Sequence, residues 1–170
     1  MPDLMSHLII ALILSEIFNI KKKSIVALGA LLPDVLSKGH LAYLHLNIAP
    51  AFSFMPFHTP AILFLLSIII CSFFRYGKLK IILWTNLGSI SHFLSDLTMK
   101  HFTIVGTRLF FPFSMSNYTL NLIWPEKSIY VLLFLSVAYV LIRFIKKSSV
   151  LNTAIRPKRN QKNKDIRDHE

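Results

Sequence analysis

The sequence is poor in cysteine, glycine and acidic residues. The shortages of cysteine and glycine each exclude a class of site. A single cysteine, Cys71, provides neither an intramolecular disulfide nor a cysteine-based zinc site. The five glycines form neither G-x-G-x-x-G nor G-x-x-x-x-G-K, so the sequence offers no nucleotide-binding loop. No serine stands in G-x-S-x-G, which leaves serine-hydrolase chemistry without support.

Charged residues are also scarce. They make up 16% of the 170 residues, whereas 54% are hydrophobic, and the mean hydropathy is +0.55. A soluble domain of this length is about one quarter charged, so the shortfall predicts an apolar exterior. The composition does not fit a disordered chain, and the length suits one domain.

Five apolar segments alternate with basic patches along the chain. The segments are residues 4–20, 24–36, 57–74, 79–97 and 128–145. The third and fifth approach the ~20 residues that span a bilayer as a helix, whereas the second is short enough to be half-inserted or buried among its neighbours. We therefore expect an all-α integral membrane protein with four to five hydrophobic helices.

The chain has 19 basic and 8 acidic residues, which give a net charge of +11, and most of the basic residues lie in these patches and in a polar tail. The patches are residues 21–23, 75–80 and 143–147, and the tail is residues 148–170. Because basic loops stay cytoplasmic, the pattern predicts a multi-pass protein of the cell membrane with its N-terminus outside. A re-entrant hairpin of the first two segments would leave this sidedness unchanged.

The same pattern divides the chain into two parts. We expect residues 1–147 to form a membrane-embedded helical domain and residues 148–170 to form a disordered cytoplasmic tail. The basic tail suits anionic lipid headgroups at the membrane surface better than nucleic acid. Nothing in the sequence fixes an oligomeric state.

Five ionisable residues of the apolar segments fall on the opposite, extracytoplasmic face in this topology. They open or close the first four segments: His7, Asp34, His58, His92 and Asp96. Ionisable groups in apolar helices are costly and tend to be functional. Imidazole and carboxylate are ligands of Zn²⁺, and mixed N/O ligation also accepts Mn²⁺ or Fe²⁺. We therefore expect a site for one or two metal ions here.

His92 and Asp96 give the sharpest local signal, in the string S-H-F-L-S-D. A spacing of four places both side chains on one helix face, as in the metal-binding H-E-x-x-H helices. A helical ion pair explains the same spacing.

The other candidates have plain alternatives too. Asp34 follows Pro33 and fits a turn or a helix cap. His58 in P-F-H-T-P fits an interfacial turn before a helix. His7 fits an interfacial histidine with satisfied hydrogen bonds, and Asp3 fits an N-cap of the first helix.

Five short motifs resemble, in order, those of the YdjM-type membrane-bound metal-dependent hydrolases. They are M-P-D-L-M-S-H-L from residue 1, G-A-L-L-P-D from 29, P-F-H-T-P from 56, G-S-I-S-H-F-L-S-D from 88 and G-T-R-L-F-F-P-F-S from 106. The set covers about two thirds of the chain. That family is distantly similar to the zinc-dependent phospholipases C, so the resemblance implies a phospholipase C-like all-helical core that holds zinc.

The resemblance also implies a role for each candidate. One zinc ion would be held by four residues: Asp34, His58, His92 and Asp96. His7 would help to hold another ion, and His101 lies one residue away from the place of a further ligand.

The chain departs from the family pattern at three points. Leu36 stands where many members carry a second aspartate, residues 53–57 lack a His-Arg pair, and no second H-x-x-x-E follows. These departures favour one or two ions over three, and an inactive descendant is an alternative.

Together these observations predict a membrane-bound metal-dependent hydrolase that attacks a phosphodiester or an ester of a lipid with metal-activated water. Asp34 or Asp96 would orient this water or bridge two ions. Arg108 would pair with a phosphate oxygen, or else it snorkels beside Phe110 and Phe111.

The rival class is a non-catalytic membrane protein, either a metal-binding or transport-related component or a helical scaffold. Transporters usually place polar residues near mid-bilayer and often contain an internal repeat. Here the polar residues lie near helix ends, and the two halves show no repeat.

Overall fold

The computed structural model describes residues 4–38, 55–75, 77–100 and 108–167, with the backbone alone for Met55 and residues 149–167. Five α-helices form this part of the chain: α1 Leu4–Ile17, α2 Lys23–Ser37, α4 Pro60–Ser72, α5 Lys78–Thr98 and α6 Ser128–Arg167. Two short 3₁₀ turns, η1 Met55–Phe57 and η2 Pro125–Lys127, precede α4 and α6. The described residues contain no strand beyond an isolated bridge between Met99 and Ile123, so the all-α prediction is confirmed.

Local signals place the helix ends close to the predicted boundaries. α1 ends in a Schellman turn: Asn19 has a left-handed φ of 53°, its N–H donates to Glu16 O, and Ile20 N–H donates to Ser15 O at 2.8 Å. Ile20 is thereby buried against α2. Pro60 begins α4 at the position where its missing N–H costs nothing.

α2 and α5 form the centre of the bundle, and two glycines let their backbones touch. A Cβ on Gly29 would lie 2.0 Å from Thr85 O, and one on Gly88 would lie 2.1 Å from Val26 O. Ser89 Oγ donates to Gly29 O at 3.1 Å across this crossing. Only small residues permit so close an approach of two helices. The orientation of His92 depends on this approach.

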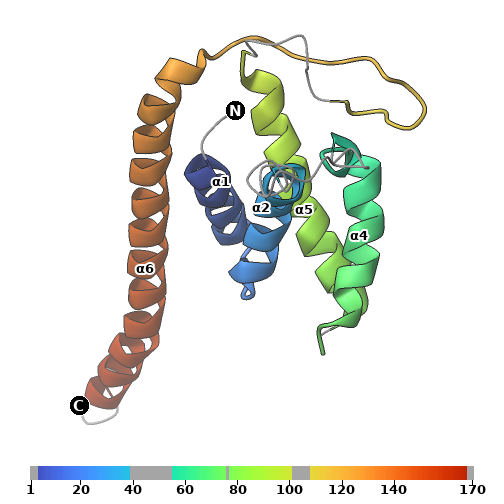
Figure 1. Cartoon of the computed structure of the whole chain (residues 1–170). Coiled ribbons are helices and arrows are strands. Elements are labelled where there is room, and N and C mark those ends of the chain that lie inside the picture. The colour runs from blue at the N-terminus through green and yellow to red at the C-terminus, as the bar shows by residue number, and fades with distance from the viewer. Residues whose placement is uncertain (1–3, 39–54, 76, 101–107, 168–170) are drawn as a thin grey trace.

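The remaining helices pack around this pair. α1 packs on α2 and α6, and α4 packs on α5 (Figure 1). Figure 1 shows that α1 and α4 begin at the end of the bundle where α5 finishes. The chain therefore brings four distant segments to one end.

The opposite end is held by a buried carboxylate. Glu16, in the last turn of α1, is 7% exposed and pairs with Lys23 of α2. Arg143 Nη1 of α6 lies 3.0 Å from Glu16 Oε1, and Lys146 Nζ lies 3.8 Å from Oε2. Nine residues of α1, roughly 13 Å of helix, separate Glu16 from His7. The predicted separation of basic residues from the histidines is thus present here.

One described helix, residues Pro125–Ser148, is long and apolar enough to cross a membrane, and none of its apolar stretch is fully buried. Leu4–Ile17 and Pro60–Ser72 are apolar but shorter. A 13-residue helix such as α4 covers only about 20 Å. The structure thus supports fewer spans by length and composition than the four to five predicted.

The predicted disordered tail differs from the structure. α6 continues past residue 148 to Arg167 without a break. Adding a residue to an existing helix costs far less than starting one, and the backbone stays helical even through Pro157. The sequence prediction considered the tail alone, without the helix that precedes it.

Candidate metal centre

Four helical segments bring the five predicted ligands to one end of the bundle. His7 lies in the first turn of α1, Asp34 in the last turn of α2, and His92 and Asp96 near the end of α5. His58 stands between η1 and α4, where Thr59 Oγ1 donates to Pro56 O at 2.7 Å and closes a tight turn. The predicted convergence of these residues is confirmed.

Three of the side chains form a compact triangle. His58 Nε2 lies 3.0 Å from His92 Nε2 and 3.1 Å from Asp96 Oδ2. His92 Nε2 lies 3.3 Å from the same Asp96 oxygen. Asp96 and His92 are therefore on one face of α5, as their spacing predicted.

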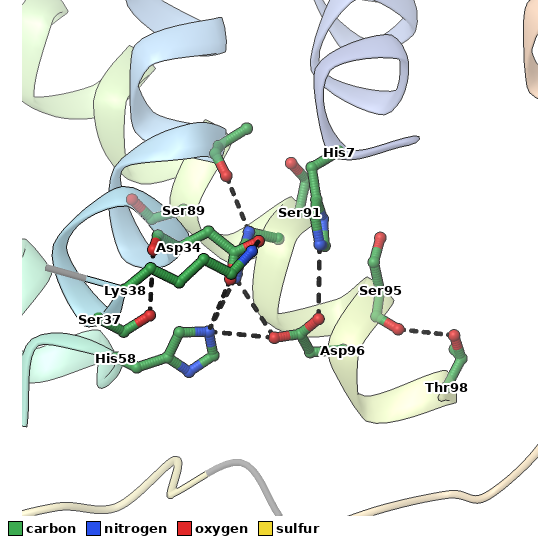
Figure 2. A network of polar contacts seen from close by, with 12 residues as sticks. His7, Asp34, Ser37, Lys38, His58, Ser89, Ser91, Ser95, Asp96 and Thr98 are labelled. Carbon is green, nitrogen blue, oxygen red and sulfur yellow. Dashed lines mark hydrogen bonds and ion pairs between the residues drawn. The ribbon is translucent and has the colours of Figure 1, made fainter. Parts of the chain in front are cut away.

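The other two side chains flank this triangle. Asp34 Oδ1 lies 3.9 Å from His58 Nε2. His7 Nε2 lies 3.5 Å from Asp96 Oδ1, and Figure 2 shows the two side chains pointing toward each other. The His7 ring also stacks on His92, with centroids 4.0 Å apart.

The close crossing of α2 and α5 fixes the orientation of His92. Its Nδ1 lies 2.8 Å from Ala30 O, one residue after Gly29. A carbonyl oxygen only accepts, so Nδ1 carries the proton and the Nε2 lone pair faces the cluster. Such a carbonyl contact is how proteins commonly orient a metal-binding histidine.

The centre is buried and contains several polar atoms without a hydrogen bond, of which His7 Nε2 and Asp96 Oδ1 face each other at 3.5 Å. The side chains of His7, Asp34, His92 and Asp96 are at most 2% exposed, whereas His58 is 17% exposed. Five buried side-chain atoms have no hydrogen-bond partner among the described residues, and four belong to the cluster: His7 Nδ1 and Nε2, Asp34 Oδ1 and Asp96 Oδ1. A buried carboxylate oxygen without a partner costs roughly 1–3 kcal/mol or more. A cation among these atoms would remove that cost, so the residues fit a metal ion.

Two overlapping ligand groups can be drawn within the described residues: His7, His92 and Asp96, and Asp34, His58 and His92. The ligand atoms of each group lie within 4.8 Å of one another. Both groups use His92, whose Nδ1 is engaged by Ala30. They therefore compete for a single nitrogen.

The plainer interpretation of Asp34 is only partly right. Its backbone carbonyl accepts from Ser37 Oγ at 3.2 Å and from Lys38 N at 3.0 Å, as at a helix end. Its carboxylate, however, pairs with Lys38 Nζ at 3.1 Å and turns Oδ1 toward His58. Lys38 was missed by the sequence prediction, although its i,i+4 spacing from Asp34 was a usable signal.

The other predicted residues do not join the centre. Arg108 Nε lies 3.4 Å from Asn117 Oδ1, and no described contact links Arg108 to the cluster. A substrate-binding role for Arg108 therefore gains no support. His101 and Asp3 lie outside the described residues.

Searches of protein-family models, curated proteins and solved structures found no match to this chain.

Proposed function

We propose that this chain is a membrane-bound metal-dependent hydrolase with a phospholipase C-like helical core. The observation that carries the proposal is the triangle of His58 Nε2, His92 Nε2 and Asp96 Oδ2, with edges of 3.0, 3.1 and 3.3 Å. Two ligands of a tetrahedral zinc ion, each at 2.0–2.1 Å, lie about 3.3 Å apart. The triangle has the size of one face of such a tetrahedron.

Asp34 is the candidate for the fourth position around the ion. Its Oδ1 lies 3.9 Å from His58 Nε2, somewhat farther than the triangle edges, and is buried without a partner among the described residues. It can ligate the ion or hold a water beside it. Zn²⁺ suits this mixed set of two imidazoles and two carboxylates, and Mn²⁺ or Fe²⁺ would also be accepted.

The contacts favour one ion over two. A second ion beside His7 and Asp96 Oδ1 would need His92 Nε2, which the first ion already uses. Among the described residues, no other group of His, Cys, Asp or Glu could hold an ion there. We therefore assign His7 as the side chain that orients Asp96, by a contact from its Nε2 to Asp96 Oδ1.

One side of the centre is open, which favours catalysis over a purely structural metal. His58 is 17% exposed, whereas the other four side chains are buried. Catalytic zinc sites keep one position accessible, whereas structural sites are closed by four protein ligands. A bound zinc ion acts as a Lewis acid and makes water nucleophilic near neutral pH. Where Asp34 Oδ1 holds that water instead of ligating the ion, it would accept the proton of the water.

The distribution of polar and apolar residues supports membrane embedding. Among the described residues, buried polar or charged side chains outnumber buried apolar ones. Large apolar side chains are exposed instead, including Leu65 and Ile69 on α4 and Phe134 and Phe144 on α6. Small residues at the α2–α5 crossing are also typical of helices packed in lipid. We propose a multi-pass protein with the centre at the extracytoplasmic face and the basic C-terminal segment at anionic cytoplasmic lipid.

A substrate at that interface would be a phosphodiester or an ester of a lipid. A second candidate, a non-catalytic zinc protein, is favoured by Asp34 Oδ1 alone, since this oxygen can complete four-coordination. Hydrolysis separates the two candidates, because only the first turns over a substrate.

The test combines metal content with hydrolysis. The purified full-length protein should contain about one zinc per chain and hydrolyse an activated phosphodiester or a phospholipid in mixed micelles. His92→Ala and Asp96→Asn should lose both properties, whereas Ser95→Ala, at an adjacent position on α5, should keep them. Zinc without hydrolysis of any ester or phosphodiester would favour the non-catalytic candidate, and full metal content in His92→Ala would rule out the site.

A further inference from the structure

Lys38 lies at the edge of the metal centre and is the one cation that contacts a cluster side chain among the described residues. It follows the last turn of α2, and its Nζ lies 3.1 Å from Asp34 Oδ2. The Lys38 side chain is 41% exposed, whereas that of Asp34 is 1% exposed. Figure 2 shows Lys38 alongside Asp34. A charged group is thus anchored at one point of the centre while open to its surroundings.

The two oxygens of Asp34 are divided between different tasks. Oδ2 accepts from the Lys38 ammonium, and Oδ1 faces His58 at 3.9 Å without a hydrogen-bond partner in the described part of the chain. Lys38 therefore occupies the other oxygen of the carboxylate and does not compete with the proposed ion for Oδ1. Its contact also holds the carboxylate plane in place.

The ammonium has donor capacity left over. A lysine carries three N–H donors, and the described contacts of Lys38 Nζ use one of them, on Asp34. The second partly exposed residue of the centre, His58, contacts the same carboxylate. Lys38 and His58 thus contact the two different oxygens of one carboxylate, and both side chains are partly exposed.

We propose that Lys38 forms an oxyanion subsite that binds a phosphate group of the substrate; this rests on the proposed function, because the same phosphate also contacts the ion. An ion on Asp34 Oδ1 would lie within about 7 Å of Lys38 Nζ, because the path adds a metal–oxygen bond, the width of the carboxylate and the 3.1 Å contact to Nζ. A phosphate with one oxygen at an ion and another at an ammonium spans about the same distance. The subsite selects phosphoesters over uncharged carboxylic esters.

A purely structural ion pair is the competing explanation, and it predicts different behaviour. If Lys38 only neutralises Asp34, its loss changes metal binding and leaves phosphate affinity of the loaded protein unaltered. If it binds an oxyanion, its loss weakens phosphate binding while zinc remains. Measurements of zinc content and phosphate affinity on one sample therefore separate the two roles.

The experiment uses the full-length protein in a neutral detergent, loaded with zinc, with inorganic phosphate as the probe in calorimetry. Lys38→Met removes the charge and keeps the length of the side chain, whereas Lys38→Arg keeps the charge. Lys80→Met is the matched control, since Lys80 is exposed in the first turn of α5, far along the helix from His92. We expect Lys38→Met to weaken phosphate binding at least about tenfold, the value of a charge-assisted hydrogen bond. Lys38→Arg should stay within about threefold of the parent, and Lys80→Met should be unchanged.

A second arm identifies the source of the phosphate. Anionic phospholipid is added to the micelles, with diacylglycerol as the uncharged control. If phospholipid displaces inorganic phosphate and diacylglycerol does not, the result supports the subsite and assigns it to a lipid headgroup. Lack of displacement supports it and assigns it to a soluble phosphate compound.

Several results would overturn the inference. Lys38→Met with full zinc and unchanged phosphate affinity excludes the subsite, as does an equal loss in Lys80→Met. Loss of zinc from Lys38→Met assigns Lys38 to the support of Asp34 alone. Zinc-loaded parent protein that binds no phosphate rejects the subsite but leaves the proposed function intact, whereas parent protein without zinc rejects both.

Discussion

The Nε2 atoms of His58 and His92 lie 3.0 Å apart, although 34 residues separate the two histidines in the sequence. His92 Nδ1 donates to Ala30 O, so His92 Nε2 is an acceptor. Without a metal ion, His58 Nε2 must carry the one proton that faces both His92 and Asp96. With an ion, the same three atoms become ligands, and no proton is needed between them. The arrangement thus places proton and metal in direct competition.

This competition predicts that zinc affinity falls in acid. Imidazole takes up a proton near neutral pH, and zinc binds only its neutral form, so protons displace the ion as the pH is lowered. We expect at least a tenfold loss of affinity between about pH 7.5 and about pH 5.5. Equilibrium dialysis against a zinc buffer at fixed ionic strength measures it. Constant affinity over this range would contradict a competition between proton and metal at this centre.

Metal removal should also lower stability. An ion that binds only the folded chain stabilises it by about 2.7 kcal/mol at a free concentration 100 times its Kd. We therefore expect a chelator to lower the unfolding temperature and zinc to restore it, whereas His92→Ala should respond to neither. Thermal unfolding in detergent, followed by circular dichroism, provides the measurement. An equal chelator effect on His92→Ala would place the stabilising ion elsewhere.

His7 tests the number of ions. As an orienting partner of Asp96 through the 3.5 Å contact, it should be dispensable for stoichiometry but not for affinity. We expect His7→Ala to bind about one zinc per chain with about 10–100-fold weaker affinity, the usual cost of losing such a support. A fall from two zinc ions in the parent to one in His7→Ala would instead make His7 a ligand of a second ion.

The sequence predicted much of this site because its signals were local. Basic clusters and prolines marked the helix ends, and the alternation of segments brought His7, Asp34, His58 and Asp96 to one end of the bundle. The order of helix packing could not be predicted, because it depends on the contact of backbones at Gly29 and Gly88. In the sequence, a glycine in a helix can mark either a flexible position or a close contact between two backbones. Only the structure, which places a distant segment against the glycine, distinguishes these alternatives.

Lys38 and Arg108 show the limits of sequence reasoning. Arg108 was chosen for its charge on the expected face, yet it contacts Asn117 and not the cluster. Lys38 was missed because its run was interpreted for its aspartate alone, although the i,i+4 spacing from Asp34 was a usable signal. The membrane topology, in contrast, is untested and stays a prediction.

Cysteine labelling tests that topology. In a Cys71→Ser background, single cysteines at Lys38 and Lys162 should react with a membrane-impermeant reagent from opposite sides of intact cells. The site end of α2 would be labelled from outside, and the basic C-terminal segment only after permeabilisation. Labelling of both positions from one side would overturn the topology while leaving the metal centre unaffected.

The glycine crossing yields the sharpest structural prediction. Gly88→Ala would place a Cβ 2.1 Å from Val26 O and 2.7 Å from Ala30 N, atoms of a backbone that cannot turn aside as a flexible side chain can. α2 and α5 must then separate, at a cost of about 1–3 kcal/mol or more. The separation also lengthens the 2.8 Å contact from His92 Nδ1 to Ala30 O, because His92 lies one helical turn after Gly88. Zinc affinity should therefore fall together with stability. Gly77→Ala is the matched control, because its Cβ would meet nothing closer than Lys80 Cδ at 4.0 Å, and both properties should be preserved. If Gly88→Ala unfolds at the parent temperature and binds zinc as tightly, the helices do not cross as described and His92 is oriented by something other than α2.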